Sequence, residues 1–168
     1  MMSPLSGPGR HLVFRRELTG PVRIRALAHG RFLACTTPLD AVRIFPALVR
    51  HDGLSRSLNL LARLATWRRS YVCVLGQDGI IACAHVTEGL CRYYPIGPQS
   101  AVLGAVWTDP GQRGRGLSEA LLGRALNLLV ARGIGAAYID TAQDNGAMLA
   151  VIHRLGFGEP VDRIEPYA

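Results

Sequence analysis

The sequence contains no lysine: all 19 of its basic residues are arginine, against 12 acidic residues, and the net charge is +7. A coding bias toward arginine is the simplest explanation, yet a basic surface also favours anionic partners such as a nucleotide, a phosphate or a nucleic acid. The sequence also lacks the ~18 consecutive uncharged apolar residues of a membrane-spanning helix. Residues 1–10 contain no apolar core of a secretory signal. We therefore expect a cytoplasmic protein with no membrane partner.

The four cysteines show no spacing that is typical of a metal site. They are Cys35, Cys73, Cys83 and Cys91. Neither a CxxC pair nor a Cys/His ligand pattern is present, so we expect no metal. Cys73 and Cys83 flank a predicted hairpin and could face each other across it, but reduced, buried thiols are the expected state in a cytosolic protein.

What the sequence does contain is enough apolar material for one globular domain. With 168 residues, 49% of them hydrophobic, the chain can bury a sizeable core and is too apolar to be disordered. Residues 1–10 are rich in Ser, Pro and Gly, which predicts a flexible tail. We expect a single domain over residues 11–168, because neither a repeat nor a linker interrupts it.

The first part of that domain mixes strand and helix patterns. Residues 11–18 and 22–28 alternate apolar and polar side chains around a Gly-Pro turn, which predicts two strands. Residues 38–51 look helical at the start, although Pro46 should end or kink that helix. Residues 54–68 predict an amphipathic helix. Its expected buried face consists of Leu54, Leu58, Leu61, Leu64 and Ala65.

From residue 71 onward the pattern is more regular. Two short apolar runs, 71–76 and 80–86, flank a Gln-Asp-Gly turn and predict a hairpin. A less regular stretch follows, with strands expected at 91–94 and 101–107. The remaining predicted elements are a strong helix at 117–132 ended by Gly133, a strand at 134–141, a helix at 146–155 capped by Asp144 or Asn145, and a strand at 157–167. The buried face of the strong helix should consist of Leu117, Leu121, Ala125, Leu128 and Leu129. This helix should cross over so that 101–107 and 134–141 run parallel.

The stretch 101–118 is the most informative about chemistry, because a buried strand leads through a basic, glycine-rich turn into a helix start. A helix N-terminus offers unpaired N–H groups and partial positive charge. Gly114 and Gly116 remove side chains that would block a ligand, while Arg113 and Arg115 add full charge. This arrangement suits a pyrophosphate, with an ordinary strand-to-helix turn as the alternative. It is neither a P-loop nor a GxGxxG fingerprint.

Two segments in this order resemble motifs of the GCN5-related N-acetyltransferase (GNAT) superfamily. The sequence RGRGLS at 113–118 is similar to the family's acetyl-CoA motif R/Q-x-x-G-x-G/A. A second segment, YIDT at 138–141 through Asn145 to LGF at 155–157, looks like the family's strand, Asn-led helix and terminal "LGF". The resemblance covers residues 71–157 well and is faint over 1–70.

The resemblance implies a fold, a coenzyme and a binding site. The fold is α/β (α+β), with a single mixed, mostly antiparallel sheet of about six or seven strands flanked by about four helices. The co-substrate is acetyl-CoA: N–H groups near Ala105 would hold the thioester carbonyl, those of 112–117 would cradle the pyrophosphate, and Asn145 would bond the pantetheine arm or merely cap its helix. The residues assigned to coenzyme binding are Gly104, Ala105, Val106, Gln112, Arg113, Gly114, Arg115, Gly116, Leu117, Ser118 and Asn145.

The sequence departs from the family pattern at two positions. Ser118 replaces a small Gly or Ala, which is a mild change. Ile152 stands where the family often has a Tyr that protonates the departing coenzyme A thiolate. His153 cannot replace that Tyr, because one step along a helix turns about 100 degrees away. We therefore predict that catalysis does not depend on an acid at position 152.

Acetyl transfer to an amine needs a neutral nucleophile, so a base is expected. His85, which interrupts an apolar strand, is the first candidate, and Glu88 in the following loop is the second. Each also has an ordinary structural interpretation. Tyr94 and Tyr138 are the candidates that could protonate the thiolate in place of water.

We expect an acetyl-CoA-dependent N-acetyltransferase that acts on a primary amine of a small molecule, either an amino sugar or a nucleotide-linked amino sugar. Two alternatives stay open: a catalytically degenerate sensor that binds coenzyme A, and a basic nucleic-acid-binding module. The scattered arginines, with no interleaved stacking aromatics, make the last alternative the weakest. The oligomer that we consider for this chain is a homodimer.

Overall fold

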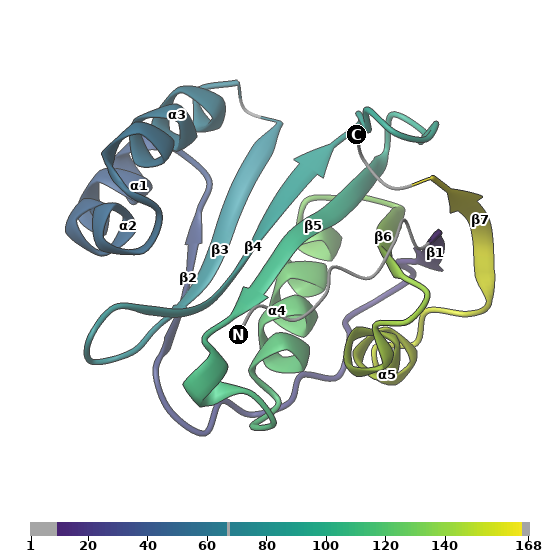
Figure 1. Cartoon of the computed structure of the whole chain (residues 1–168). Coiled ribbons are helices and arrows are strands. Elements are labelled where there is room, and N and C mark those ends of the chain that lie inside the picture. The colour runs from purple at the N-terminus through teal and green to yellow at the C-terminus, as the bar shows by residue number, and fades with distance from the viewer. Residues whose placement is uncertain (1–9, 67, 166–168) are drawn as a thin grey trace.

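One seven-stranded sheet organises the computed structural model of the chain, which describes residues 10–66 and 68–165. The tail expected at 1–10 therefore falls outside the described residues except for Arg10. In chain order the strands are β1 (His11–Glu17), β2 (Arg31–Cys35), β3 (Arg69–Leu75), β4 (Ile80–Glu88), β5 (Ser100–Thr108), β6 (Ala136–Ala142) and β7 (Pro160–Ile164). Their spatial order is β2-β3-β4-β5-β6-β1-β7 (Figure 1).

The described residues form five α-helices, one more than expected. They are α1 (Pro38–Arg43), α2 (Phe45–Asp52), α3 (Leu54–Leu64), α4 (Leu117–Ala131) and α5 (Gly146–Arg154), and a 3₁₀ turn, η1, spans Pro110–Gln112. The extra helix arises because the pattern at 38–51 divides at Ile44 into α1 and α2. Pro46 lies in the first turn of α2, where its missing N–H is not needed. None of these helices is long and apolar enough to cross a membrane.

Strand pairing is antiparallel throughout except between β5 and β6, which run parallel on either side of the crossover helix α4. The mixed sheet, the crossover and the β3–β4 hairpin are therefore confirmed. Cys73 lies directly opposite Cys83 in that hairpin, and both thiols are buried and free. Burial raises the pKa of Cys73 to about 12, so this thiol stays protonated at neutral pH.

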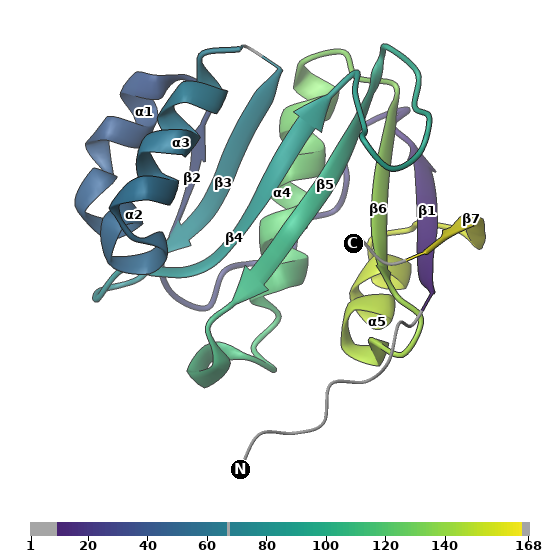
Figure 2. The same cartoon turned by 45° about the horizontal axis from the view of Figure 1, so that its top comes forward.

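Helices cover both faces of the sheet, as the two views show (Figures 1 and 2). On β4, Ala82, Ala84 and Val86 point to the core under α4 and α5, while Cys83 points to a second core under α1, α2 and α3. Alternate side chains of β4 thus pack into two different hydrophobic clusters, one on each face of the sheet. The predicted face of α4 packs into the first cluster, where only Leu128 of the expected residues is partly exposed. Gly133 ends this helix with a φ of +74°.

Two predicted strands are wrong. Residues 22–27 have no regular structure, and the second strand of the chain is instead β2, further along, which pairs with β3. The segment runs along α4 rather than beside a strand: the Val22 N–H donates to Asn127 Oδ1 (2.6 Å), and Asn127 Nδ2 donates back to the Val22 carbonyl (3.0 Å). Residues 91–94 also form no strand. An alternating pattern of apolar and polar residues does not reveal whether the backbone N–H and carbonyl groups of a segment bond to another strand or to the side chains of a neighbouring helix.

The buried face predicted for α3 is also wrong. Leu54 and Leu58 are 57% and 51% exposed. The residues that α3 buries against the sheet are Ser57, Leu60 and Leu64. The helix lies at the margin of the molecule (Figure 2) and contacts the sheet chiefly at β3, so part of its apolar surface meets no other element among the residues that the structure describes.

Candidate active site

The sheet opens between β5 and β6 at the position where a ligand is expected. The two strands pair from Ser100 with Ala136 to Leu103 with Ile139, and β5 continues beyond this point to Thr108 without pairing to β6. On the other side of β5 the register to β4 shifts, and Ala105 takes a φ of +48°. A bulge therefore turns this part of β5, and its backbone groups face the gap rather than β6. Residues 104–106, predicted to hold a thioester carbonyl, lie here.

A pocket of about 710 Å³ lies on the α4 side of this gap. Its wall is built by the end of β5, the turn into α4, and α5, and Arg25 reaches it from the segment before β2. The predicted coenzyme residues that line it are Val106, Gln112, Arg113, Gly114, Gly116, Leu117, Ser118 and Asn145. Gly104, Ala105 and Arg115 are not part of its lining. The structure thus brings together eight of the eleven residues assigned to coenzyme binding.

The start of α4 is open toward this pocket. Gly116 is the N-cap residue in the left-handed conformation, and no side chain caps the first N–H groups of the helix. Ser118 Oγ lies 2.8 Å from Thr108 Oγ1, a contact that fixes the helix start to the end of β5. A cradle of free N–H groups at the positive end of a 15-residue helix can bind a phosphate or pyrophosphate.

Arg25 is a residue of this pocket that the sequence did not reveal. Its guanidinium lies against Gly116, so a Cβ added to that glycine would collide with it. Arg25 pairs with Glu119 at 3.5 Å, and Arg154 of α5 pairs with the same carboxylate at 2.8 Å. Since Arg113 also lines the pocket, three guanidinium groups face one carboxylate, which leaves net positive charge beside the α4 N-terminus. No local sequence pattern joins Arg25 to a loop some 90 residues later.

Asn145 and Ile152 have structural positions on α5. Asn145 caps the helix: its Oδ1 accepts from the Met148 N–H (3.2 Å), and its Nδ2 donates to Thr141 Oγ1 (3.1 Å). Because Asn145 also lines the pocket, its role toward a pantetheine arm stays a prediction. Ile152 is fully buried in the first cluster. Position 152 therefore presents neither a proton donor nor an opening to the pocket.

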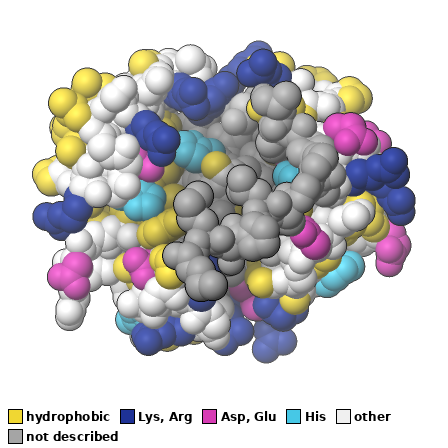
Figure 3. Space-filling view, viewed as in Figure 1, with side chains coloured by type: hydrophobic (Ala, Val, Ile, Leu, Met, Phe, Trp, Pro, Cys, Tyr) yellow, Lys and Arg dark blue, Asp and Glu magenta, His cyan; other side chains and the backbone are white. Residues whose placement is uncertain are grey.

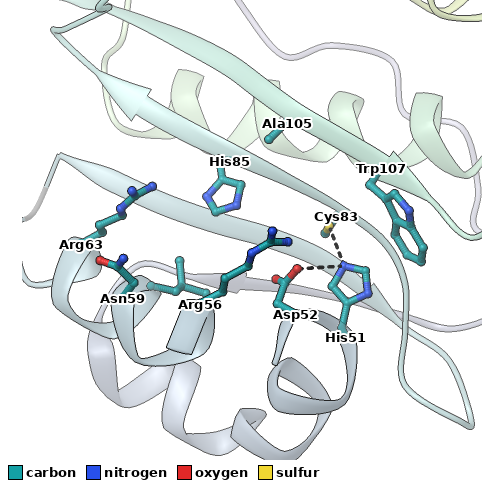
Figure 4. A pocket seen from close by; sticks show the side chains of 10 residues that line it. His51, Asp52, Arg56, Asn59, Arg63, Cys83, His85, Ala105 and Trp107 are labelled. Atoms are coloured by element: carbon teal, nitrogen blue, oxygen red, sulfur yellow. Dashed lines mark hydrogen bonds and ion pairs between the residues drawn. The ribbon is translucent and has the colours of Figure 1, made fainter. Parts of the chain in front are cut away.

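A second pocket, also about 710 Å³, lies on the opposite face of the sheet, between α2, α3, β4 and β5. Ten residues line it: His51, Asp52, Arg56, Asn59, Leu60, Arg63, Cys83, His85, Ala105 and Trp107 (Figure 4). In the space-filling view, histidine and arginine side chains lie around the hollow on this face (Figure 3). Trp107 lines both pockets, and Ala105 of this pocket adjoins Val106 of the other. The two pockets therefore meet at residues 105–107 of β5.

His85 lies in this second pocket, opposite Gly104 of β5. Burial lowers the pKa of His85, and Arg63 and Arg69 lower it further, against an opposing effect of Asp52. The imidazole is therefore neutral at physiological pH and can accept a proton. Its ring packs edge-on against Tyr71, with 5.2 Å between the centroids.

His51 and Asp52, at the end of α2, are polar residues of this pocket that the sequence did not single out. His51 Nε2 lies 3.8 Å from Asp52 Oδ1 and 3.6 Å from Cys83 Sγ, and the His51 ring lies 4.3 Å from that of Trp107. Burial raises the pKa of Cys83 to about 11, so this thiol is not a ready nucleophile. No group of three metal-ligating side chains occurs within residues 10–66 and 68–165.

Three predicted catalytic residues line neither pocket. Glu88 forms an ion pair with Arg132, which follows α4. Tyr94 is buried and donates a hydrogen bond to Asp140 Oδ1 (3.2 Å), and its ring lies 6.1 Å from that of Tyr138. The structure therefore brings Tyr94, from the irregular stretch between β4 and β5, next to Tyr138 of β6, but outside both pockets. Of the four candidates, His85 alone lines a pocket that contacts the bulge at Ala105.

Solved structures with the same fold are numerous. A putative GNAT-family acetyltransferase from Novosphingobium aromaticivorans is 18% identical, with a TM-score of 0.62 over 94% of this chain and 62% of its own. A GCN5-related N-acetyltransferase from Sphaerobacter thermophilus is 19% identical, with a TM-score of 0.63 over 94% of this chain and 50% of its own. The aminoglycoside N-acetyltransferase AAC(6')-Iy, solved with CoA, is 17% identical, with a TM-score of 0.59 over 82% and 98%.

For four of the matching solved structures, including the first two named above, this chain spans only between half and two thirds of their own length. At such identities the likeness concerns the fold. No curated protein sequence matches the chain. The sequence profile of the acetyltransferase (GNAT) family, however, matches residues 44–157, which include the opened strands, the turn into α4 and all ten residues that line the second pocket. By this match over two thirds of its length, the chain belongs to the GNAT family of acetyltransferases.

Proposed function

We propose that this protein transfers an acetyl group from acetyl-CoA to a primary amine of a small molecule. The observation that carries the proposal is the meeting of two pockets at the bulged, unpaired part of β5. One pocket is suited to a pyrophosphate, and the other contains a neutral histidine. A coenzyme and an acceptor entering from opposite faces would bring their reacting groups together at residues 105–107.

The residues of the first pocket fit coenzyme A. The uncapped N–H groups of α4, the bare Cα of Gly116 and the guanidinium groups of Arg25 and Arg113 supply hydrogen bonds and positive charge for a pyrophosphate. Backbone N–H groups at 104–106 would polarise the thioester carbonyl and stabilise the oxyanion that forms there.

In the second pocket His85 would accept the proton that the attacking amine loses. The amine nitrogen forms a bond to the carbonyl carbon, the bond from that carbon to sulfur breaks, and the leaving thiolate takes a proton from water, because Tyr94 and Tyr138 line neither pocket. A thiolate whose conjugate acid has a pKa of ~8.5 is a fair leaving group, so the absence of an acid at Ile152 is tolerable. A protonated amine, in contrast, cannot attack at all, so the base matters more than the acid.

We infer an amino sugar or a nucleotide-linked amino sugar as the acceptor. Support for a small-molecule amine comes from structural neighbours that are aminoglycoside acetyltransferases, one of them solved with sisomicin. The cytoplasmic location and a homodimer stay predictions.

Calorimetric titration of acetyl-CoA and of an oligonucleotide, each at two salt concentrations, tests this proposal. We expect acetyl-CoA to bind at both salt concentrations. Tight oligonucleotide binding without acetyl-CoA binding would instead support the nucleic-acid module. Turnover is then measured as thiol release with a broad panel of amines, and the products are identified by mass. Binding of acetyl-CoA without any acetylated product would support the coenzyme A sensor.

A further inference from the structure

Two arginines of α3 project into the second pocket from the same side. Arg56 and Arg63 are seven residues apart, about two helical turns, so they lie one above the other on one face of the helix. Asn59 lies between them on that face and also lines the pocket. Figure 4 shows both guanidinium groups directed toward the space in front of β4.

Neither arginine has a partner within the described part of the chain: no ion pair or hydrogen bond forms at either side chain. By contrast, the arginines around the coenzyme pocket and at Glu88 are engaged, as the pairs of Arg25 and Arg154 with Glu119 and of Arg132 with Glu88 show. An exposed guanidinium that nothing inside the protein holds is available to a ligand.

The charges of the pocket favour an anion. Asp52 is the one carboxylate of the lining, set against Arg56 and Arg63, and burial keeps His85 neutral. The positive groups lie on α3, whereas Asp52 lies at the end of α2 and the bulge at Ala105 lies across the pocket on the sheet. A ligand with a negative group at one end and an amine at the other would match this separation.

We propose that the acceptor carries a phosphate or a carboxylate in addition to its amine, and that Arg56 and Arg63 bind this anionic group. The proposal rests on the acetyl transfer proposed above and narrows its substrate class. A guanidinium pairs with either anion through two parallel N–H donors. The anion would hold the far end of the acceptor at α3 and leave its amine between His85 and Ala105. A polycationic amine such as sisomicin would meet two positive charges and bind poorly.

Matched pairs of amines test this directly, in turnover with saturating acetyl-CoA. The pairs are ethanolamine with phosphoethanolamine, glucosamine with glucosamine 6-phosphate, and β-alaninamide with β-alanine, with sisomicin as the polycation. At least one anionic member should exceed its neutral partner about tenfold or more in kcat/KM, the effect of one charge-assisted hydrogen bond. The phosphate and carboxylate pairs distinguish the two anions.

The variant R56Q/R63Q should abolish this preference while its affinity for acetyl-CoA stays unchanged. The matched control is R43Q on α1, an exposed arginine that lines neither pocket, and it should keep the preference. Equal or better use of the neutral members or of sisomicin, or a preference that survives in R56Q/R63Q, would overturn the proposal.

A binding measurement separates this result from a failure of the catalytic proposal. The same compounds are titrated by calorimetry into the protein saturated with coenzyme A, where no transfer can occur. Tighter binding of the anionic members that R56Q/R63Q abolishes would support the acceptor class, even in a protein that turns nothing over. If no anionic member binds more tightly than its neutral partner, the arginines do not select the acceptor.

Discussion

The two sides of β5 are built in different ways. The pocket proposed for the coenzyme is formed largely by one stretch of chain, from β5 through the turn into α4 to α5, and much of its polar lining is backbone: free N–H groups, left-handed glycines and a helix end. The pocket proposed for the acceptor is assembled from α2, α3, β4 and β5, and its polarity comes from side chains that are far apart in the sequence.

Because of this difference, one pocket depends on features that the fold must keep, and the other depends on side chains that can vary. A backbone cradle needs glycine and a helix start at fixed spacing, so it leaves a short pattern in the sequence. Side chains that face an acceptor can be replaced one at a time without disturbing the sheet behind them. The side proposed for the coenzyme therefore carries the family's sequence pattern, and under the proposed function the other side would determine the substrate.

Loss of the backbone cradle should have the largest effect. Gly116 and Gly114 share a φ of +75°, but a Cβ at Gly116 would collide with Arg25, whereas a Cβ at Gly114 meets open space. Gly116→Val should therefore abolish acetyl-CoA binding in calorimetry. Gly114 also lines the pocket, so the side chain of Gly114→Val would enter the space of the ligand and should weaken binding, but less than Gly116→Val, which in addition displaces Arg25. Both variants bear a similar backbone strain of about 1–2 kcal/mol.

Thermal unfolding of both variants provides the control, because matched midpoints exclude a general loss of structure. Unchanged affinity in Gly116→Val would remove the α4 turn from the coenzyme site.

The same difference explains how far the sequence could predict the structure. The parallel pair β5 and β6, the α4 crossover and the α4 turn follow from periodicities and motifs within about 60 residues, and they are confirmed. Arg25 could not be found this way, because the segment that carries it is held by side chains of α4 rather than by a strand.

The acceptor side shows the same limit. The hydrophobic pattern of α3 contains two overlapping apolar faces, and only packing against the sheet selects Leu60 and Leu64 over Leu54 and Leu58. Because Leu60 and Leu64 face the sheet, Arg56 and Arg63 of the same helix line the pocket. His85 was identifiable because it interrupts an apolar strand, whereas nothing in the sequence brings the end of α2 to β4.

Removal of the base should have the next largest effect, on the acceptor side alone. His85→Ala should lower kcat/KM about 100-fold or more with a confirmed acceptor, and leave the affinity for acetyl-CoA unchanged. Because the pKa of His85 is lowered, its neutral form persists below pH ~6.5. The wild-type pH profile of kcat/KM should fall on an acidic limb below that value, as His85 takes up a proton, and in His85→Ala this limb should be replaced by one at higher pH that follows the ionisation of the amine itself.

Glu88→Ala is the matched comparison, since Glu88 was the second candidate and is held by Arg132 away from both pockets. We expect it to keep the wild-type rate and limb. If both variants do so, neither residue is the base, and direct attack by the small neutral fraction of the amine becomes the better account.

Charge on the coenzyme side should have a smaller, salt-dependent effect. Arg113 lines the coenzyme pocket, and Arg115 neighbours it in the turn. Coenzyme A affinity should weaken as ionic strength rises, and weaken less in R113Q/R115Q, because exposed charge contacts are screened by salt. R31Q/R43Q removes two exposed arginines that line neither pocket and should keep the wild-type salt slope. If the salt dependence of coenzyme A affinity is the same in all three proteins, Arg113 and Arg115 do not contribute charge to binding, and the backbone N–H groups hold the coenzyme alone.

The smallest effect is expected at the capping box that begins α1 on the acceptor side. Thr37 Oγ1 accepts from the Asp40 N–H (3.3 Å), while Asp40 Oδ2 accepts from the N–H groups of Thr36 and Thr37 (3.0 Å each). Burial alone would raise the pKa of Asp40. The hydrogen bonds that its carboxylate accepts, first from the Thr37 hydroxyl (2.9 Å) and then from the N–H groups of Thr36 and Thr37, outweigh burial and hold the pKa below its usual value. A carboxylate with a lowered pKa stabilises the fold above its unfolded pKa of ~3.9, and that contribution is lost as the pH falls through the folded value.

Asp40→Asn should therefore lower the free energy of unfolding by about 1 kcal/mol at neutral pH, the usual scale of a helix cap. The difference from wild type should shrink below pH ~4, as the wild-type carboxylate becomes protonated. Denaturant unfolding at pH 7 and at pH 3 measures both values, and Glu159→Gln, at an exposed position, is the control. Acetyl-CoA affinity at pH 7 should be the same in all three proteins, because α1 lies across the sheet from α4. A loss of coenzyme affinity in Asp40→Asn would show that the two sides of β5 are coupled, and that their separate construction does not make them independent in function.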